Sequence, residues 1–173
     1  GSEMCIRDRS LPGHGQSDWQ NTYAATDFID IVNNHIDPKK RNVVIGHSMG
    51  AKIALHTLEK NHTHISELIL LDPPIGAPYF KRKNSPSQRH RTYEHIDKLI
   101  ERFRIIPKQP MPNPFINHYV AKHSIRTFQD GYQWQFDPNF FAKFSTLGKE
   151  SYEPPSSVRS NLYLIHGEYS TIT

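Results

Sequence analysis

The segment Gly46-His47-Ser48-Met49-Gly50 has the residue types and spacing that place a reactive serine on a tight turn. A serine hydroxyl can attack a carbonyl carbon once a base removes its proton, and the G-x-S-x-G pattern needs a strand before it and a helix after it. Both are expected here, because a β-branched run, "NVVIG", precedes Ser48 and a helical pattern follows it. We predict that Ser48 is a catalytic nucleophile; a Gly-Ser turn without chemistry is the alternative.

The same turn indicates how negative charge on a reacting oxygen would be stabilised. Ser48 would lie at the N-terminus of the following helix, where backbone N–H groups lack intrahelical acceptors and the helix dipole favours an anion. The N–H of Met49 is therefore predicted to donate a hydrogen bond to the oxyanion. Crowding at the turn is expected to exclude bulky side chains at both flanking glycines, Gly46 and Gly50.

Three short apolar runs and two helical patterns must position this turn. The runs "NVVIG" (42–46), "ELILLD" (67–72) and "NLYLIHG" (161–167) are typical of buried strands. Helices are predicted within "AATDFIDIVNNHI" and "MGAKIALHTLEKNH". The apolar face predicted for the second helix consists of Ile53, Ala54, Thr57 and Leu58. Strands that alternate with helices predict an α/β fold with a parallel sheet and helices on both faces.

The composition changes between the second and third strands. Residues from Pro73 to Pro155 are rich in proline, aromatic and charged residues, and about 80 residues is too long for an ordinary connection. We predict an inserted helical subdomain packed over the carboxyl edge of the sheet, with helices at 87–103, at 114–124 and after Asp137-Pro138. The predicted boundaries are a first core segment at 10–75, the insert at 76–156 and a truncated second core segment at 157–173.

Four motifs together resemble a known family. The segments "LPGHGQSDW", "VVIGHSMGAKIAL", "LILLDPP" and "NLYLIHGEYS" occur in the order and spacing of the α/β-hydrolase fold superfamily, and the insert is similar in position to its helical cap. The resemblance implies a carboxylesterase-like serine hydrolase that cleaves an ester, thioester or amide of a small-molecule acyl substrate, without a cofactor. The alternatives within the superfamily are a lyase, a cofactor-free haloperoxidase and a binding protein without catalysis.

The resemblance also implies where the catalytic acid lies. Most members carry an aspartate after the strand that matches "NLYLIHG", in a Gly-x-x-Asp pattern, but here that pattern ends in Ser170. A minority carry the acid one strand earlier, where this chain has Asp72, 24 positions after Ser48. We predict Asp72 as the acid, with Glu168 as the second candidate. The non-catalytic interpretation of Asp72 is a turn-forming Asp-Pro, and that of Glu168 is a solvated charge in a loop.

No histidine within the chain is predicted to be the catalytic base. The family's histidine follows one further strand, so it is expected beyond Thr173, and the loop with the second oxyanion donor is expected upstream. The sequence thus reads as an interior fragment that is essentially inactive by itself. Among the histidines present, His14 is expected to brace its loop and His166 to be packed at a strand end.

Substrate contacts are predicted at the turn and in the insert. His47 lies beside the nucleophile, and Trp134 belongs to an alternating aromatic stretch, "DGYQWQFDP". Both are candidates for contacting the substrate, with core packing as the alternative for Trp134. No spacing of histidines or cysteines indicates a metal site.

Composition narrows the function classes further. The formal net charge of +4 comes largely from Lys81–Arg104, where eight basic residues face three acidic ones. No nucleic-acid reader motif accompanies them, so a solvated surface is favoured over nucleic-acid binding. No apolar run reaches the roughly 18 residues of a membrane span. Neither nucleic acid nor a membrane is therefore expected as a partner.

The N-terminal residues differ from the rest of the chain. Residues 1–9 hold the only cysteine, Cys5, and resemble an in-frame translation of a sequencing adapter, so native sequence is expected to begin near Ser10. A native part without cysteine favours a reducing, cytoplasmic compartment. A disordered native N-terminus is the alternative interpretation of these nine residues.

Overall fold

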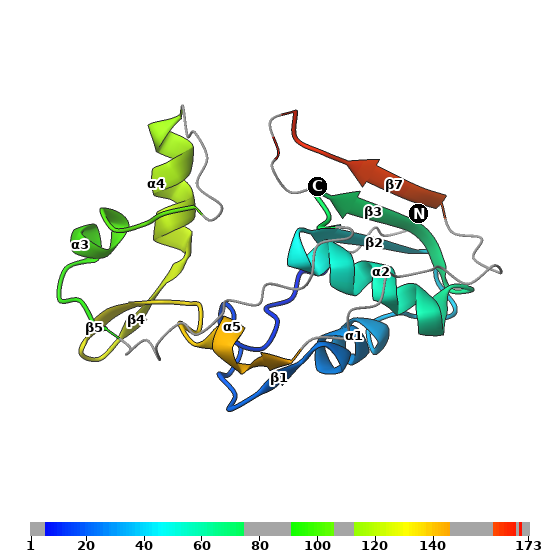
Figure 1. Cartoon of the computed structure of the whole chain (residues 1–173), viewed down its shortest axis with the longest axis horizontal. Helices are drawn as coiled ribbons and strands as arrows, with labels where there is room; N and C mark the ends of the chain where they lie inside the picture. Colours follow the sequence, from blue (N-terminus) through cyan, green and yellow to red (C-terminus); the bar gives the residue numbers. More distant parts are fainter. Residues whose placement is uncertain (1–5, 75–90, 106–112, 146–160, 169, 171–173) are drawn as a thin grey trace. The chain divides into compact units, whose positions relative to one another are not determined.

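The computed structural model describes residues 6–74, 91–105, 113–145, 161–168 and 170, which form two compact units (Figure 1). The sheet unit falls within Thr22–Lys81 and Phe144–Thr173, and the insert unit falls within Gly1–Asn21 and Arg82–Lys143. The first residues of the predicted core segment 10–75 group with the insert by their contacts. The predicted boundaries, and the placement of the insert over the sheet edge, stay predictions.

A parallel three-stranded sheet is the centre of the sheet unit. Its strands are β2 (Asn42–His47), β3 (Ile65–Leu71) and β7 (Asn161–Ile165), in the order β2-β3-β7. The three predicted strands are therefore confirmed to within a few residues. Because the strands are parallel and Leu71 pairs with both His47 and Ile165, their carboxyl ends meet at one edge.

Two helices complete this unit. Helix α2 (Met49–Asn61) packs against β2 and β3, and α1 (Ala25–Asn33) packs chiefly against α2 (Figure 1). The core between α2 and the sheet consists of Ala51, Ala54, Leu55, Leu58, Ile65, Leu68 and Leu70. The predicted apolar face of α2 is confirmed, since all four of its side chains are buried. A short parallel pair, β1 (Tyr23–Ala24) with β6 (Phe144–Ser145), adjoins α1.

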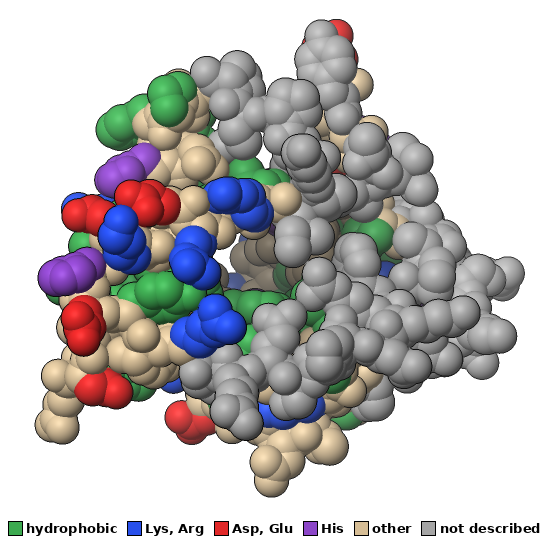
Figure 2. Space-filling model, turned by 60° about the vertical axis from the view of Figure 1, so that its left-hand side comes forward, with side chains coloured by type: hydrophobic (Ala, Val, Ile, Leu, Met, Phe, Trp, Pro, Cys, Tyr) green, Lys and Arg blue, Asp and Glu red, His purple; other side chains and the backbone are tan. Residues whose placement is uncertain are grey.

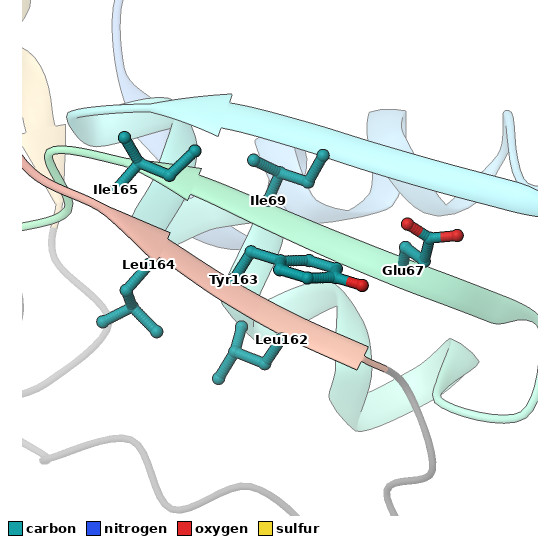
Figure 3. Close-up of a pocket in the computed structure, with 6 residues that line it drawn as sticks. All are labelled: Glu67, Ile69, Leu162, Tyr163, Leu164 and Ile165. Carbon is teal, nitrogen blue, oxygen red and sulfur yellow. The ribbon is translucent and has the colours of Figure 1, made fainter.

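The other face of the sheet is open within the described residues. Val43 and Ile45 on β2 are 46% and 62% exposed, and Ile165 on β7 is 53% exposed. A shallow groove runs along β3 and the edge strand β7 (Figure 3). Its lining residues on the open face are Glu67, Ile69, Tyr163 and Ile165, whereas Leu162 and Leu164 of β7 point to the opposite face of the sheet. The predicted burial of the third strand is thus wrong for this part of the chain, because β7 is an edge strand that no described helix covers. Among the described helices, α2 packs on one face of the sheet and none packs on the other, so the prediction of helices on both faces is not met by this part of the chain.

The insert unit is a mixture of short helices and a hairpin. Its helices are α3 (Ile96–Ile100), α4 (Pro114–His123) and α5 (Phe140–Lys143). Its antiparallel hairpin pairs β4 (Ile125–Phe128) with β5 (Gly131–Trp134). The predicted helices at 114–124 and after Asp137-Pro138 are confirmed. None of the described helices is long and apolar enough to cross a membrane.

One helix of the insert is shorter than the predicted range 87–103. Residues 87–90 lie outside the described part, and within 91–103 only Ile96–Ile100 is helical. Tyr93 instead exchanges two backbone hydrogen bonds with Tyr132 of β5, at 2.9 and 2.8 Å, which hold it in an extended conformation. A tertiary contact has therefore overridden the local helical pattern.

Side chains on the surface of the insert unit are of mixed type. Figure 2 turns this unit toward the viewer and shows basic, acidic and hydrophobic side chains interspersed. The described part of the basic stretch pairs locally: Lys98 lies 3.6 Å from Glu101, and Arg102 lies over the Tyr93 ring. This arrangement agrees with a solvated helix surface rather than a continuous basic patch.

Candidate active site

The turn between β2 and α2 has the strained geometry that the serine pattern predicts. Ser48 has φ 50° and ψ −119°, outside the regions that L-residues ordinarily occupy. A Cβ at Gly46 would lie 2.4 Å from the Gly50 carbonyl oxygen and 2.6 Å from the Ala51 Cα, so only glycine fits there. A Cβ at Gly50 meets no heavy atom of the described residues within 4 Å. Crowding is thus confirmed at Gly46, whereas at Gly50 a Cβ alone would not be crowded and the exclusion of bulkier side chains stays a prediction.

Backbone hydrogen bonds tie the ends of the three strands together. The N–H of Ser48, just after β2, donates to the carbonyl oxygen of Leu71 at the end of β3, at 2.9 Å. The N–H of Asp72, just after β3, donates to the carbonyl oxygen of Ile165 at the end of β7, at 2.7 Å. The serine and the aspartate therefore follow neighbouring strands at the carboxyl edge of the sheet, where open α/β sheets bind ligands.

Backbone strain singles out the same two residues. Among the described residues, Ser48 and Asp72 are the two non-glycine residues with positive φ, at 50° and 49°. A residue held in such a conformation costs on the order of 1–3 kcal/mol, and strained residues cluster at functional sites. The strain identifies these two residues by a route that is independent of the sequence pattern.

The Asp72 carboxylate has two side-chain neighbours from the segment after β7. The Ser170 hydroxyl donates to Oδ2 at 2.6 Å, and His166 Nδ1 lies 3.5 Å from Oδ1. The Ser170 hydrogen bond is the main cause that lowers the pKa of Asp72; partial burial opposes it, and the Gly167 backbone and His166 lower the pKa further. The side chain is therefore held as an anion, which is the form that can orient and stabilise an imidazolium.

The other predicted site residues of the sheet unit are available for contacts. An oxyanion donor must have a free N–H, and within the described residues no group accepts a hydrogen bond from the Met49 N–H. His47 is the last residue of β2 and its side chain is exposed. Glu168, the second candidate for the acid, is also exposed.

His14 and Trp134 lie in the insert unit, so the structure does not place them relative to Ser48. Trp134 packs against Phe103, with ring centroids 5.8 Å apart, and its contact with substrate stays a prediction. The His14 ring lies against Phe136 and Phe140, and its Nδ1–H donates to the Pro12 carbonyl at 3.1 Å. These contacts agree with a histidine that braces its loop.

Sequence reasoning missed two residues that face the acid. His166 was expected to be packed at a strand end, but its side chain is 41% exposed and lies beside Asp72. For Ser170, the sequence shows only that a serine stands where an aspartate is expected. That departure is the signal that could have identified Ser170, because this position lies beside Asp72 in the folded chain. No group of three or more His, Cys, Asp or Glu side chains in the described residues is arranged to hold a metal ion.

Comparison with known proteins agrees with this geometry. The family described as "Alpha/beta hydrolase family" matches residues 10–168. The lipase LipV of Mycobacterium tuberculosis is 21% identical over 165 residues, which cover 92% of this chain and 63% of the lipase. Over its aligned part, the chain therefore spans less than two thirds of the length of that relative.

Two solved structures share the fold. A thioesterase domain from the curacin biosynthetic pathway superposes with a TM-score of 0.68 at 22% identity, over 94% of this chain and 65% of that domain. A hypothetical protein from Pseudomonas aeruginosa superposes with a TM-score of 0.55 at 16% identity, over 90% of this chain and 71% of that protein. The predicted resemblance and fold class are confirmed. On the extent of the family match and the likeness in fold, the chain belongs to the alpha/beta hydrolase family.

Proposed function

We propose that the protein is a serine hydrolase that cleaves ester, thioester or amide bonds through an acyl-enzyme, with Ser48 as the nucleophile and Asp72 as the acid. The single observation that carries the proposal is the juxtaposition at the sheet edge. Ser48 and Asp72 follow adjacent parallel strands, are joined through the Ser48 N–H to Leu71 O bond, and both have positive φ. Side chains that perform chemistry are commonly held in such strained positions.

The proposed reaction has two steps. Ser48 Oγ attacks the carbonyl carbon of the substrate while a histidine base takes the hydroxyl proton. The Met49 N–H donates to the oxyanion of the tetrahedral intermediate, and the N-terminus of α2 adds a favourable dipole. The histidine then protonates the departing alcohol, thiol or amine. Water attacks the acyl-enzyme by the reverse route and releases the acid and free Ser48.

The substrate class follows from the same proposal. A lipase and a thioesterase domain are among the similar proteins, and their names support an oxygen or sulfur ester as the bond that is cleaved. A small-molecule acyl compound is part of the proposal. His47, which is exposed beside the nucleophile, is proposed to contact that substrate. Trp134 is proposed to contact it from the insert unit. The carboxylesterase-like character belongs to this proposal as well.

A fluorophosphonate probe tests the nucleophile on the complete protein encoded by the parent open reading frame. The wild-type protein is expected to be labelled, and Ser48→Ala is expected to lose both the label and the hydrolysis of p-nitrophenyl acetate. Ser66→Ala, which changes another half-buried serine of the sheet unit, is the matched control and should keep both. Labelling that persists in Ser48→Ala would contradict the assignment. A labelled protein that hydrolyses no ester or thioester would favour a non-hydrolytic relative.

The base is tested on the 173 residues alone. If no histidine within these residues takes the Ser48 proton, turnover of p-nitrophenyl acetate should be lower than that of the complete protein by on the order of 10⁴-fold. Turnover by the short chain at the rate of the complete protein, lost in Ser48→Ala, would show that a histidine within these residues is the base.

A further inference from the structure

We propose that Ser170 is a positioning residue that fixes the Asp72 carboxylate through a hydrogen bond to Oδ2, and so leaves Oδ1 to accept from the catalytic base. The inference rests on the proposed roles of Ser48 and Asp72, and it assigns a task to a residue outside the predicted triad. Its basis is the arrangement of the two carboxylate oxygens, which have different surroundings.

The Oδ2 oxygen is held from the segment that follows β7. Ser170 N–H donates to the Gly167 carbonyl at 3.0 Å, which closes a turn and fixes the position of the Ser170 side chain. From that turn the Ser170 hydroxyl reaches Oδ2 at 2.6 Å. The backbone of Asp72 is bound to the same end of β7, through its N–H to Ile165 O bond. Backbone and side chain of the acid are thus held by one segment.

The Oδ1 oxygen is inaccessible to solvent and lacks a donor with normal hydrogen-bond geometry within the described residues, although the Gly167 backbone and the His166 side chain both favour the charged carboxylate. Its polar side-chain neighbour there is His166, whose Nδ1 lies 3.5 Å away, beyond the normal range of a hydrogen bond. A carboxylate oxygen without a donor is costly to bury, so this oxygen requires one. An imidazole N–H is the donor that a serine triad supplies at this point.

A hydroxyl at position 170 suits an acid at position 72. A second carboxylate within hydrogen-bond distance of Asp72 would repel it and raise the pKa of one of the two. A hydroxyl instead donates to the anion. The serine at 170 and the aspartate at 72 are therefore two parts of one arrangement.

The test uses the complete protein, with kcat and KM measured on p-nitrophenyl acetate. Ser170→Ala is expected to lower kcat about tenfold, the usual effect of losing a hydrogen bond to a charged group, while KM changes less than about twofold because Ser170 does not touch the substrate. Ser170→Thr keeps the hydroxyl and should retain most of kcat. Cysteine has a similar shape to serine but is only a weak hydrogen-bond donor, so Ser170→Cys should behave like Ser170→Ala. If the alanine variant does not fold, the cysteine variant is measured in its place.

Two further measurements separate positioning from general stability. Thr57→Val removes a hydroxyl whose hydrogen bond goes to the Ala54 backbone in the same unit, so it is the matched control and should leave kcat unchanged. In an Asp72→Asn background, adding Ser170→Ala should lower kcat by less than about twofold, since both changes act through one group. A full tenfold loss in that background, or an unchanged kcat in Ser170→Ala, would overturn the positioning role. Loss of activity in Ser48→Ala in the same experiments would leave the proposed function standing.

Discussion

The sheet unit and the insert unit hold their parts together by different means. In the sheet unit, backbone hydrogen bonds join strand to strand and continue beyond the strand ends, to Ser48 and Asp72. In the insert unit, backbone bonds are confined to the hairpin and short links such as Tyr93 to Tyr132, and side chains add a ring contact between Phe140 and His14 and a buried pair of Asp137 with Lys143 at 2.9 Å. The candidate nucleophile and acid lie in the sheet unit, at the ends of its bonded strands.

The difference indicates which changes each unit tolerates. A site positioned by backbone bonds depends on the room available to the main chain, so one added carbon at a tight turn is harmful. A unit positioned by rings and a buried ion pair depends on those side chains and on their protonation. The predictions on the ring cluster, on the Ser48 turn and on the acid each compare a damaging change with a matched harmless one in the same unit.

The largest effect on stability is expected in the ring cluster of the insert unit. Phe140 is completely buried, and its ring lies 5.7 Å from that of Phe136. Phe140→Ala should destabilise the insert unit by about 4 kcal/mol, whereas Phe115→Ala, at a side chain that is 73% exposed, should have little effect. Hydrogen exchange followed by mass spectrometry should show faster exchange of insert amides in Phe140→Ala. Equal acceleration in both units would mean that they unfold together.

The next effect concerns the turn that holds Ser48. Gly46→Ala should destabilise the sheet unit by about 2 kcal/mol and slow fluorophosphonate labelling of the complete protein, because its Cβ would lie 2.4 Å from the Gly50 carbonyl oxygen. Gly50→Ala adds the same atom into open space within α2 and should be neutral or stabilising by about 0.5 kcal/mol. Denaturant unfolding and labelling rates measure both. Similar losses in the two variants would show that crowding does not shape the turn.

The smallest effect is a pH dependence of the insert unit. Burial lowers the pKa of His14 below its ordinary value of 6.5, against the opposing effects of the Pro12 carbonyl and Asp137. The unfolded chain therefore binds this proton at higher pH than the folded chain, and the insert unit should lose stability as the pH falls below about 6.5. Other histidines titrate too, so the diagnostic quantity is the change of pH slope in His14→Gln, measured by hydrogen exchange. An unchanged slope would show that His14 is not buried as described.

Much of the sheet unit could be predicted from local pattern. The β-branched runs located β2, β3 and β7, and the spacing of Ile53, Ala54, Thr57 and Leu58 gave the buried face of α2. The strained serine followed from one glycine pattern. These features are local, because strand composition and helical periodicity are set by near neighbours in the chain.

The insert unit was harder to predict because its structure depends on distant contacts. The hairpin of β4 and β5 was missed, although Asp130-Gly131 is a turn signal between two short strands, and Gly131 has a φ of 134°. The extended Tyr93 is explained by its bonds to Tyr132, 39 positions away, which no local window reveals. For the same reason, the contact of Ser170 with Asp72, across 98 positions, is visible only in the folded chain.

The assignment of the acid is the central claim, and kcat of the complete protein in two neutralised variants tests it most directly. Asp72→Asn keeps the shape of the side chain and removes its charge, and kcat should fall by on the order of 10⁴-fold with Ser48 still in place. Glu168→Gln makes the same chemical change at an exposed position and should leave kcat within about twofold of the wild type. A large loss in Glu168→Gln together with an active Asp72→Asn would contradict the account.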